Sequence, residues 1–153
     1  MLLLTFDSLN NKLEKSILKT NLLRKPLHKR VREILLTKIN IISKEKEFYR
    51  KSFLKLIYPN NNKFLIKKIY KSVDLVWYLA GDTSTDFNFY TKRILLTAIY
   101  IRVMIFYFNN HSIPGTEKII DDSLLKTSKI TNIKERFNFM KKNIPNIWSF
   151  IKR

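Results

Sequence analysis

Three aspartates in one short stretch are the residues of this sequence whose type and spacing come closest to a site for chemistry. Asp74, Asp82 and Asp86 lie around a polar interruption, and three carboxylates that share a corner could bind a hard cation. Helix capping and salt bridges to Lys92 or Arg93 explain the same carboxylates more simply. We therefore expect no metal ion here, and the cation site stays an alternative.

Motifs of catalysis are not found elsewhere in the sequence. There are two histidines, His28 and His111, and no cysteine, so thiolate metal sites and disulfides are excluded. No glycine-rich phosphate loop, Glu-x-x-His pair or recognisable nucleophile context occurs. His28 is interpreted as an ordinary surface histidine in the first turn of a helix. We expect neither enzymatic activity nor a cofactor.

Composition indicates one globular domain with an anionic partner or a highly charged surface. The chain has 153 residues, 45% of them hydrophobic, which is enough for a real core. Its formal net charge of +18 attracts anionic membrane surfaces and nucleic acid alike. The excess of Lys also accompanies an excess of Asn and Ile, so a merely solvated basic surface is the alternative.

The polar interruption predicts a corner between two helices. An apolar helical pattern over residues 63–80 stops at Gly81, which suits the left-handed position after a helix end. Thr83 and Asp86 have the spacing of a capping box for the next helix. In the first helix of this pair, Leu65, Ile69, Val73, Val76 and Leu79 are expected to point inward, and Lys67, Lys68 and Lys71 outward.

The other elements are predicted to be helices too, because no segment shows sustained two-residue alternation. The predicted helices are residues 9–23, a helix opened by Pro26, a helix capped by Ser43, residues 63–80, residues 86–108 and a short polar helix over residues 116–126. The longest apolar run, residues 94–108, is too short to span a bilayer and is interrupted by Arg102.

The helix over residues 86–108 is predicted to be central, because from Ile94 onward it is hydrophobic on nearly every side. Such a helix has to be covered all round, by neighbouring helices, by a ligand or by a second subunit. A plain packed core is the alternative to a ligand pocket. The candidate pocket residues are Ile99, Tyr100, Val103, Met104, Phe106 and Tyr107.

The C-terminal residues form an apolar stripe flanked by cations, with a bend or break at Pro145. This pattern is typical of a helix that lies in a membrane interface; folding back on the domain or pairing with another subunit is the alternative. We divide the chain into a helical core domain, residues 1–128, and a basic amphipathic helix, residues 129–153. The candidate membrane residues are Ile133, Phe137, Met140, Lys141, Lys142 and Trp148.

The stretch around the corner also resembles the signature of a known family. Its sequence is Trp77-Tyr78-Leu79-Ala80-Gly81-Asp82-Thr83-Ser84-Thr85-Asp86-Phe87-Asn88-Phe89-Tyr90-Thr91-Lys92-Arg93. It is similar to the Trp-Tyr-x-Ala-Gly-Asp-x-Ser-Thr-Asp-Phe-x-Trp-Tyr-Thr-Lys/Arg-Arg pattern of the Coq-nine family of ubiquinone-biosynthesis accessory proteins. Phe89 departs from the pattern, since the family has Trp there.

The resemblance implies a fold, a ligand and partners. It implies a TetR-like all-helical ligand-binding and dimerisation domain that binds an isoprenoid lipid without catalysis and forms a homodimer. It further implies peripheral contact with the bacterial cytoplasmic membrane or the matrix side of the mitochondrial inner membrane. There the protein would present quinone intermediates to the demethoxyubiquinone hydroxylase. The matching positions that would face this partner are Asp86, Phe89, Tyr90 and Arg93.

The resemblance also implies an alternative function, a TetR-like regulator that binds nucleic acid. Family members carry a helix-turn-helix module ahead of the part matched here, and we expect it to be lacking in this chain. Sequence-specific DNA recognition would then lack its usual recognition helix. The lipid-binding accessory function is therefore preferred.

Overall fold

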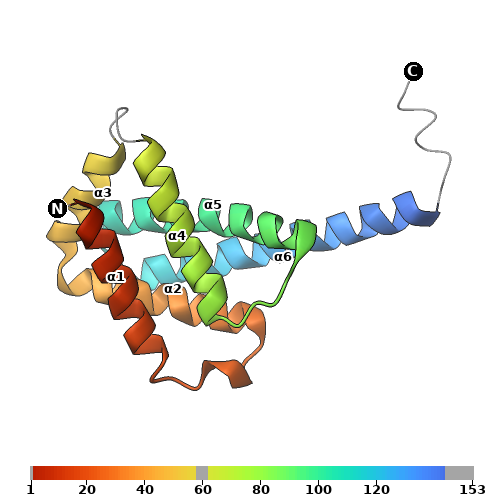
Figure 1. The fold of residues 1–153 in the computed structure, drawn as a ribbon, viewed down its shortest axis with the longest axis horizontal. Coiled ribbons are helices and arrows are strands. Elements are labelled where there is room, and N and C mark those ends of the chain that lie inside the picture. Colours follow the sequence, from red (N-terminus) through yellow and green to blue (C-terminus); the bar gives the residue numbers. More distant parts are fainter. Residues whose placement is uncertain (1, 58–61, 144–153) are drawn as a thin grey trace.

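The computed structural model describes the backbone of residues 2–57 and 62–143 and the side chains of residues 5–55, 63–85 and 89–129. Within these ranges the chain is helical and has no strand, which confirms the all-α prediction. In chain order the helices are α1 (Leu2–Ile17), the 3-10 helix η1 (Leu22–Arg24), α2 (Leu27–Lys44), α3 (Lys46–Ile57), α4 (Asn62–Leu79), α5 (Asp86–Asn110) and α6 (Ile113–Asn143) (Figure 1).

The core lies where the apolar faces of the first five α-helices meet the start of α6. In α2 the buried positions recur every three or four residues, so one stripe of the helix faces inward. The inward residues expected in α4 are buried or half-buried, as predicted. The core stripe of α2 consists of Val31, Ile34, Leu35, Lys38, Ile39 and Ile42.

Several helix boundaries differ from the predicted ones. The first helix begins at Leu2, not Leu9, and ends at Ile17, where the Thr20 hydroxyl donates a hydrogen bond to the Ile17 carbonyl. The predicted cap Ser43 instead lies within α2, and its hydroxyl donates to the Asn40 carbonyl. The capping signals did not mark the helix ends here, because Ser and Thr hydroxyls also donate hydrogen bonds to carbonyls three or four residues earlier in a helix.

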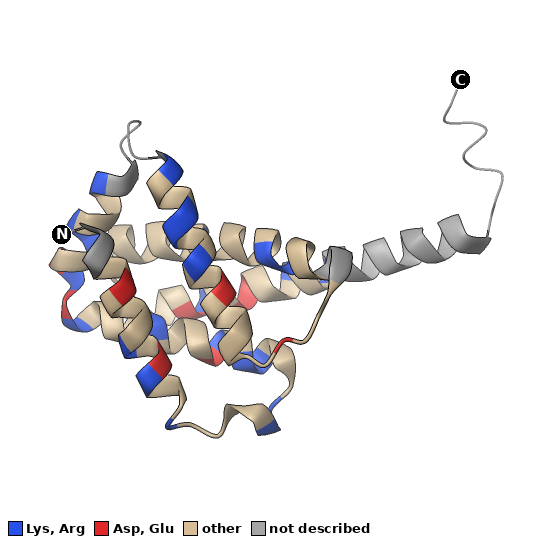
Figure 2. Ribbon diagram, viewed as in Figure 1, with Lys and Arg blue, Asp and Glu red and all other residues tan. Residues whose placement is uncertain are grey.

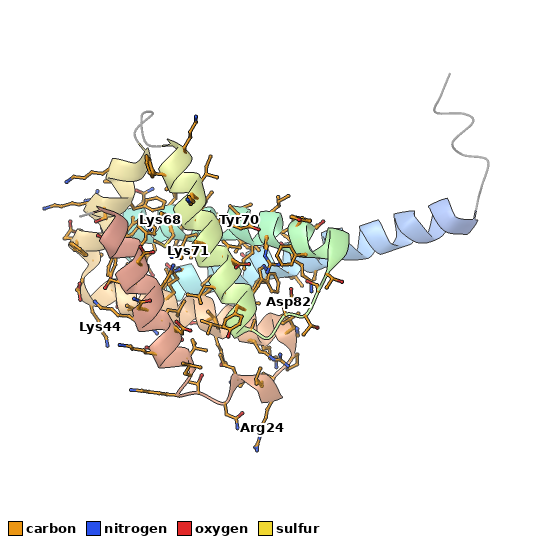
Figure 3. The ribbon with its side chains drawn as sticks, viewed as in Figure 1. Arg24, Lys44, Lys68, Tyr70, Lys71 and Asp82 are labelled. Atoms are coloured by element: carbon orange, nitrogen blue, oxygen red, sulfur yellow. The ribbon has the colours of Figure 1, made fainter. Side chains whose placement is uncertain are left out.

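Lys68 was expected to point outward, but its side chain is largely buried. Its ammonium group lies 2.8 Å from a carboxylate oxygen of Asp7 in α1. Lys71 contacts the other oxygen of the same carboxylate at 3.3 Å, and both contacts lower the pKa of Asp7 against the opposing effect of burial. The two lysines therefore help to hold α4 against α1, and Figure 3 labels both of them on α4.

The last described helix, α6, is much longer than the short polar helix predicted over residues 116–126. It begins at Ile113 because Pro114 and Gly115 belong to its first turn, where proline needs no hydrogen-bonded amide. Its early residues pack on α2 and α5. Arg32 of α2 bonds to Glu117 and Asp121, and the Arg102 guanidinium of α5 lies 3.2 Å from the Ser123 hydroxyl.

No helix in the described part of the chain is both long enough and apolar enough to span a bilayer.

Candidate functional site

The corner between α4 and α5 is built on a left-handed glycine. Gly81 has φ +72°, a conformation that glycine adopts without steric cost. This turn lets the Asp82 amide donate to the Trp77 carbonyl at 3.0 Å and the Gly81 amide donate to the Tyr78 carbonyl at 3.0 Å. The predicted helix end at Gly81 is confirmed. The predicted capping box is wrong, because the residue before α5 is Thr85, in an extended conformation.

An arginine from α2 holds this corner through hydrogen bonds to backbone carbonyls. The Arg30 guanidinium donates to the Ala80 carbonyl at 2.8 Å and to the Leu23 carbonyl at 3.0 Å. Its Nε donates to the Lys25 carbonyl at 2.6 Å. A Cβ atom on Gly81 would lie 3.3 Å from this guanidinium, so Arg30 packs closely against the corner. Arg30 thereby connects the end of α4 with the chain around η1.

Asp82 is the buried carboxylate of the corner (Figure 3). Its side chain is 3% exposed and accepts hydrogen bonds from the Lys92 ammonium, at 2.6 Å, and from the Ser84 hydroxyl. Burial raises the pKa of Asp82, but these hydrogen bonds outweigh it and leave the pKa below its ordinary value. Lys92 also lies 5.4 Å from the centre of the Trp77 ring.

Arg93 is the second cation of the corner, and its side chain is buried. Its Nε donates to Asp74 at 2.7 Å and its Nη1 donates to the Phe89 carbonyl at 3.2 Å. The guanidinium also lies over the Phe89 ring, 3.2 Å from its centre. Asp74 and Asp82 are thus both engaged by cations, which confirms the salt bridges to Lys92 and Arg93. The side chain of Asp86 lies outside the described residues.

Exposed apolar and aromatic residues surround this charged corner. Tyr78 is 71% exposed, Tyr90 62% and Ile94 69%. Tyr90 and Ile94 are one turn apart on α5, and Tyr78 is in the last turn of α4. Of the residues that the sequence suggested for a partner surface, Tyr90 is exposed, Phe89 is half-buried beneath Arg93, and Arg93 is buried. The sequence reasoning missed Ile94, whose exposure no local pattern indicates.

The six residues suggested for an apolar pocket fall on different sides of α5. Ile99, Tyr100, Val103, Met104 and Tyr107 are buried in the core, whereas Phe106 lines an open groove on the face toward α6. The groove has a volume of about 650 Å³, within the range of small-molecule sites. Its lining is Ala98, Ile101, Arg102, Ile105, Phe106, Asn109, Asn110 and Ile119.

A buried lysine in the core was not singled out by the sequence reasoning. Lys38 of α2 is 1% exposed, and its ammonium donates to the Ser72 hydroxyl at 2.8 Å and to the Asn10 side-chain oxygen at 3.2 Å. It lies 4.7 Å from the centre of the Tyr100 ring. Burial lowers the pKa of Lys38 to about 7. The available signal was its place at helical spacing between Ile34 and Ile42.

The suggested membrane residues lie beyond what the structure describes in detail. Ile133, Phe137, Met140, Lys141 and Lys142 belong to α6, but their side chains are outside the described residues. Trp148 is outside the described residues altogether. Their contact with a membrane therefore stays a prediction.

A family model described as COQ9 matches residues 63–131 of the chain. The chain is 42% identical over 65 residues to the probable ubiquinone biosynthesis protein coq9, mitochondrial, of Dictyostelium discoideum, covering 39% of this chain and 21% of that protein. It is 34% identical over 70 residues to the ubiquinone biosynthesis protein COQ9, mitochondrial, of Homo sapiens, covering 46% and 22%. These matches span less than a quarter of each relative's own length.

Proposed function

We propose that the protein is a non-catalytic accessory protein of ubiquinone biosynthesis, because residues 63–131 match the COQ9 family model and resemble the COQ9 relatives. In this proposal it binds an isoprenoid lipid and presents a quinone intermediate to a membrane-associated demethoxyubiquinone hydroxylase. The family match is the observation that carries the proposal, because it includes α5 together with nearly all of α4 and the first part of α6. Those elements build both the exposed corner and the groove.

The partner surface of the proposal is the exposed part of the corner, Tyr78, Tyr90 and Ile94. Large aromatic side chains that stand in water are the usual anchors of protein interfaces. Arg93 supports this surface from beneath, because it holds the first turn of α5 through Phe89 and Asp74. Its role is therefore to position Tyr90 rather than to contact the hydroxylase.

The lipid site of the proposal is the groove between α5 and α6. Ile101, Ile105, Phe106 and Ile119 give it an apolar wall, which suits an isoprenoid chain. Arg102 and the two asparagines at its edge supply hydrogen-bond donors for a polar head group. The core residues Tyr100 and Met104 are not part of this site.

The rest of the proposal concerns location and assembly. The proposed location is the matrix side of the mitochondrial inner membrane or the equivalent bacterial surface, and the names of the curated relatives, which are mitochondrial proteins, support the mitochondrion. The C-terminal stripe then contacts the anionic bilayer, and the protein acts as a homodimer.

Substituting Ile133, Phe137 and Met140 by serine should lower vesicle binding without lowering the melting temperature, and unchanged binding would contradict the membrane role of the stripe.

The lipid part is tested by native mass spectrometry of the purified protein, followed by lipid extraction. We expect an isoprenoid quinone or precursor to co-purify. Ile105→Trp should fill the groove and remove the lipid, whereas Ile94→Trp, on the same helix but outside the groove, should retain it. A wild-type protein without lipid, or equal occupancy in both variants, would contradict a lipid site in the groove.

The partner part is tested with the detergent-solubilised hydroxylase. Tyr90→Ala should weaken binding by about tenfold or more, as expected for an exposed aromatic anchor. Phe48→Ala removes an exposed ring from α3, away from the corner, and should leave the affinity unchanged. Melting temperatures of both variants should match the wild type; equal affinities would place the interface elsewhere.

A further inference from the structure

The end of the hairpin formed by α3 and α4 is rich in cations and lacks acids. Between Glu47 and Asp74 the sequence has no acidic residue. The two helices contact each other, and Figure 2 shows Lys and Arg residues on both of them. Some of these cations form ion pairs, Lys68 and Lys71 with Asp7 and Arg50 with Glu47. The cations of this stretch are Arg50, Lys51, Lys55, Lys63, Lys67, Lys68 and Lys71.

Large apolar side chains stand in water among these cations, three of them toward the end of the hairpin and a fourth, Tyr70, further along α4. Phe64 is 55% exposed, Ile66 is 68% exposed and Leu54 is 48% exposed. Phe64 follows Lys63 directly and Ile66 precedes Lys67, and both lysines are exposed. We name the group of Lys51, Leu54, Lys63, Phe64, Ile66 and Lys67 the α3–α4 tip. Among the described residues, Lys51, Lys63 and Lys67 have no carboxylate partner within salt-bridge distance.

This combination fits an anionic bilayer surface better than a nucleic acid. Lysine stems cover apolar surface while their ammonium groups reach lipid phosphates, and aliphatic side chains gain free energy in the acyl boundary. A nucleic-acid platform stacks bases on flat rings, but two of the three apolar side chains of the α3–α4 tip, Leu54 and Ile66, are aliphatic. The charge of the tip also opposes binding to another copy of itself.

We propose that the α3–α4 tip is a membrane-contact surface that inserts Phe64, Ile66 and Leu54 into the interface of an anionic bilayer. This contact is additional to the one proposed for the C-terminal stripe. It orients the domain, because two separated contacts hold a rigid body at a defined angle to the membrane. The tip binds transiently on its own, since each lysine near the surface contributes only modestly.

Because the 153-residue sequence has no cysteine, a single labelled cysteine can be introduced into the whole chain for a direct test. An environment-sensitive fluorophore is attached through Ile66→Cys and, as a control, through Leu18→Cys, an exposed leucine after α1. Vesicles of phosphatidylcholine alone are compared with an equal mixture of phosphatidylcholine and phosphatidylglycerol. We expect a blue shift for the label at position 66 with the anionic vesicles only, and no shift for the label at position 18.

The charge contribution is tested by two variants with the same net charge. Lys63→Gln with Lys67→Gln should weaken binding to the anionic vesicles by about tenfold or more. Lys19→Gln with Lys29→Gln removes two exposed lysines elsewhere and should change binding less than about threefold. Equal weakening in both variants would show that total charge, not the tip, determines binding, and would overturn the proposal.

The remaining outcomes separate the tip from the other proposals. A label at position 66 that stays unshifted while the protein floats with the vesicles would overturn the tip and leave the C-terminal stripe standing. A shift that persists after Phe137→Ser and Met140→Ser supports the tip as a contact of its own. A shift with duplex DNA but not with vesicles would assign the tip to nucleic acid and overturn the membrane contact.

Discussion

Lys38 is the residue whose environment departs furthest from what its type prefers. Its ammonium group has two neutral acceptors, Asn10 and Ser72, and a ring, Tyr100, but no carboxylate within salt-bridge distance in the described structure. A buried lysine without a counter-charge favours the neutral amine, which is why its pKa falls to about 7. Near neutral pH, protonation of the buried Lys38 amine therefore destabilises the folded protein.

This predicts a pH dependence of stability. The folded pKa lies below the unfolded one, so the unfavourable contribution is complete below about pH 7 and is relieved as the pH rises toward 10.5. We expect the unfolding free energy to rise by about 2 kcal/mol between pH 7 and pH 9. Urea unfolding at both pH values measures this change.

Lys38→Met is the matched control for that measurement. Methionine fills the same volume without a proton, and Ser72 still donates to the Asn10 oxygen at 2.8 Å. The variant should be more stable than the wild type at pH 7 and should lose the rise toward pH 9. A variant that is less stable at pH 7, with the same pH dependence, would contradict this assignment of the buried proton.

Gly81 is the residue on which the corner depends. Gly81→Ala should lower stability by about 1–2 kcal/mol, because a side chain disfavours the left-handed conformation, and its Cβ would lie 3.1 Å from Leu23. Gly81→Asn should cost less, since Asn tolerates this conformation better. Thermal unfolding distinguishes them, and equal melting temperatures for Ala, Asn and Gly would contradict a requirement for positive φ.

At the scale of elements, ion pairs between helices hold the corner. Arg93 of α5 reaches Asp74 of α4, and Lys92 reaches Asp82 in the connection between them. These pairs orient α5 so that Tyr90 faces water while Tyr100, further along the same helix, is buried. The orientation of the exposed surface is therefore linked to the packing of α4 against α5.

A double-mutant cycle measures this link. Asp74→Asn and Arg93→Gln should show a coupling of about 1–2 kcal/mol, because a charged hydrogen bond is lost but Asp74 is half-exposed and screened. The same cycle on the exposed pair Lys12 and Glu45 should give a clearly smaller coupling, because both side chains are screened by water. Equal coupling for both pairs would mean that Arg93 does not fix the corner.

At the scale of the whole molecule, 30 Lys and Arg residues face only 12 Asp and Glu residues, which leaves a net charge of +18 and makes the few local ion pairs important. Asp7 lies between Lys68 and Lys71, and Asp82 contacts Lys92. Both carboxyls have pKa values below 3.8. Their contribution is therefore present above about pH 4 and is lost as the pH falls through the lowered pKa values.

Acid should consequently unfold the protein steeply. We expect the urea midpoint to be constant from about pH 6 to pH 5 in the Lys38→Met background and to fall below about pH 4, where repulsion among the cations is no longer compensated. Asp7→Asn with Asp82→Asn should lower the midpoint at pH 6 and flatten the fall. An unchanged acid transition in this variant would show that other carboxyls determine it.

The helical class and the position of the corner could be predicted, because both depend on short-range pattern. Glycine after an apolar helix indicates a left-handed end wherever the helix lies in the fold. The inward face of α4 was also predicted, since Ile69, Val73 and Val76 share one stripe. The helix boundaries were less predictable. Pro114 could precede a helix or lie in its first turn, and Ser43 could cap a new helix or lie in the last turn of the preceding one.

The sequence alone could not determine which side of α5 faces the core. An apolar stripe identifies the buried face of a helix, but a helix that is apolar on nearly every side has no such stripe. Only the packing of α4 and α6 places Tyr100 and Met104 inside, Phe106 in the groove and Ile94 in water. Likewise, the burial of Arg93 and Lys38 arises from partners many residues away in the chain, because Asp74, Asn10 and Ser72 are brought to them only by the tertiary fold.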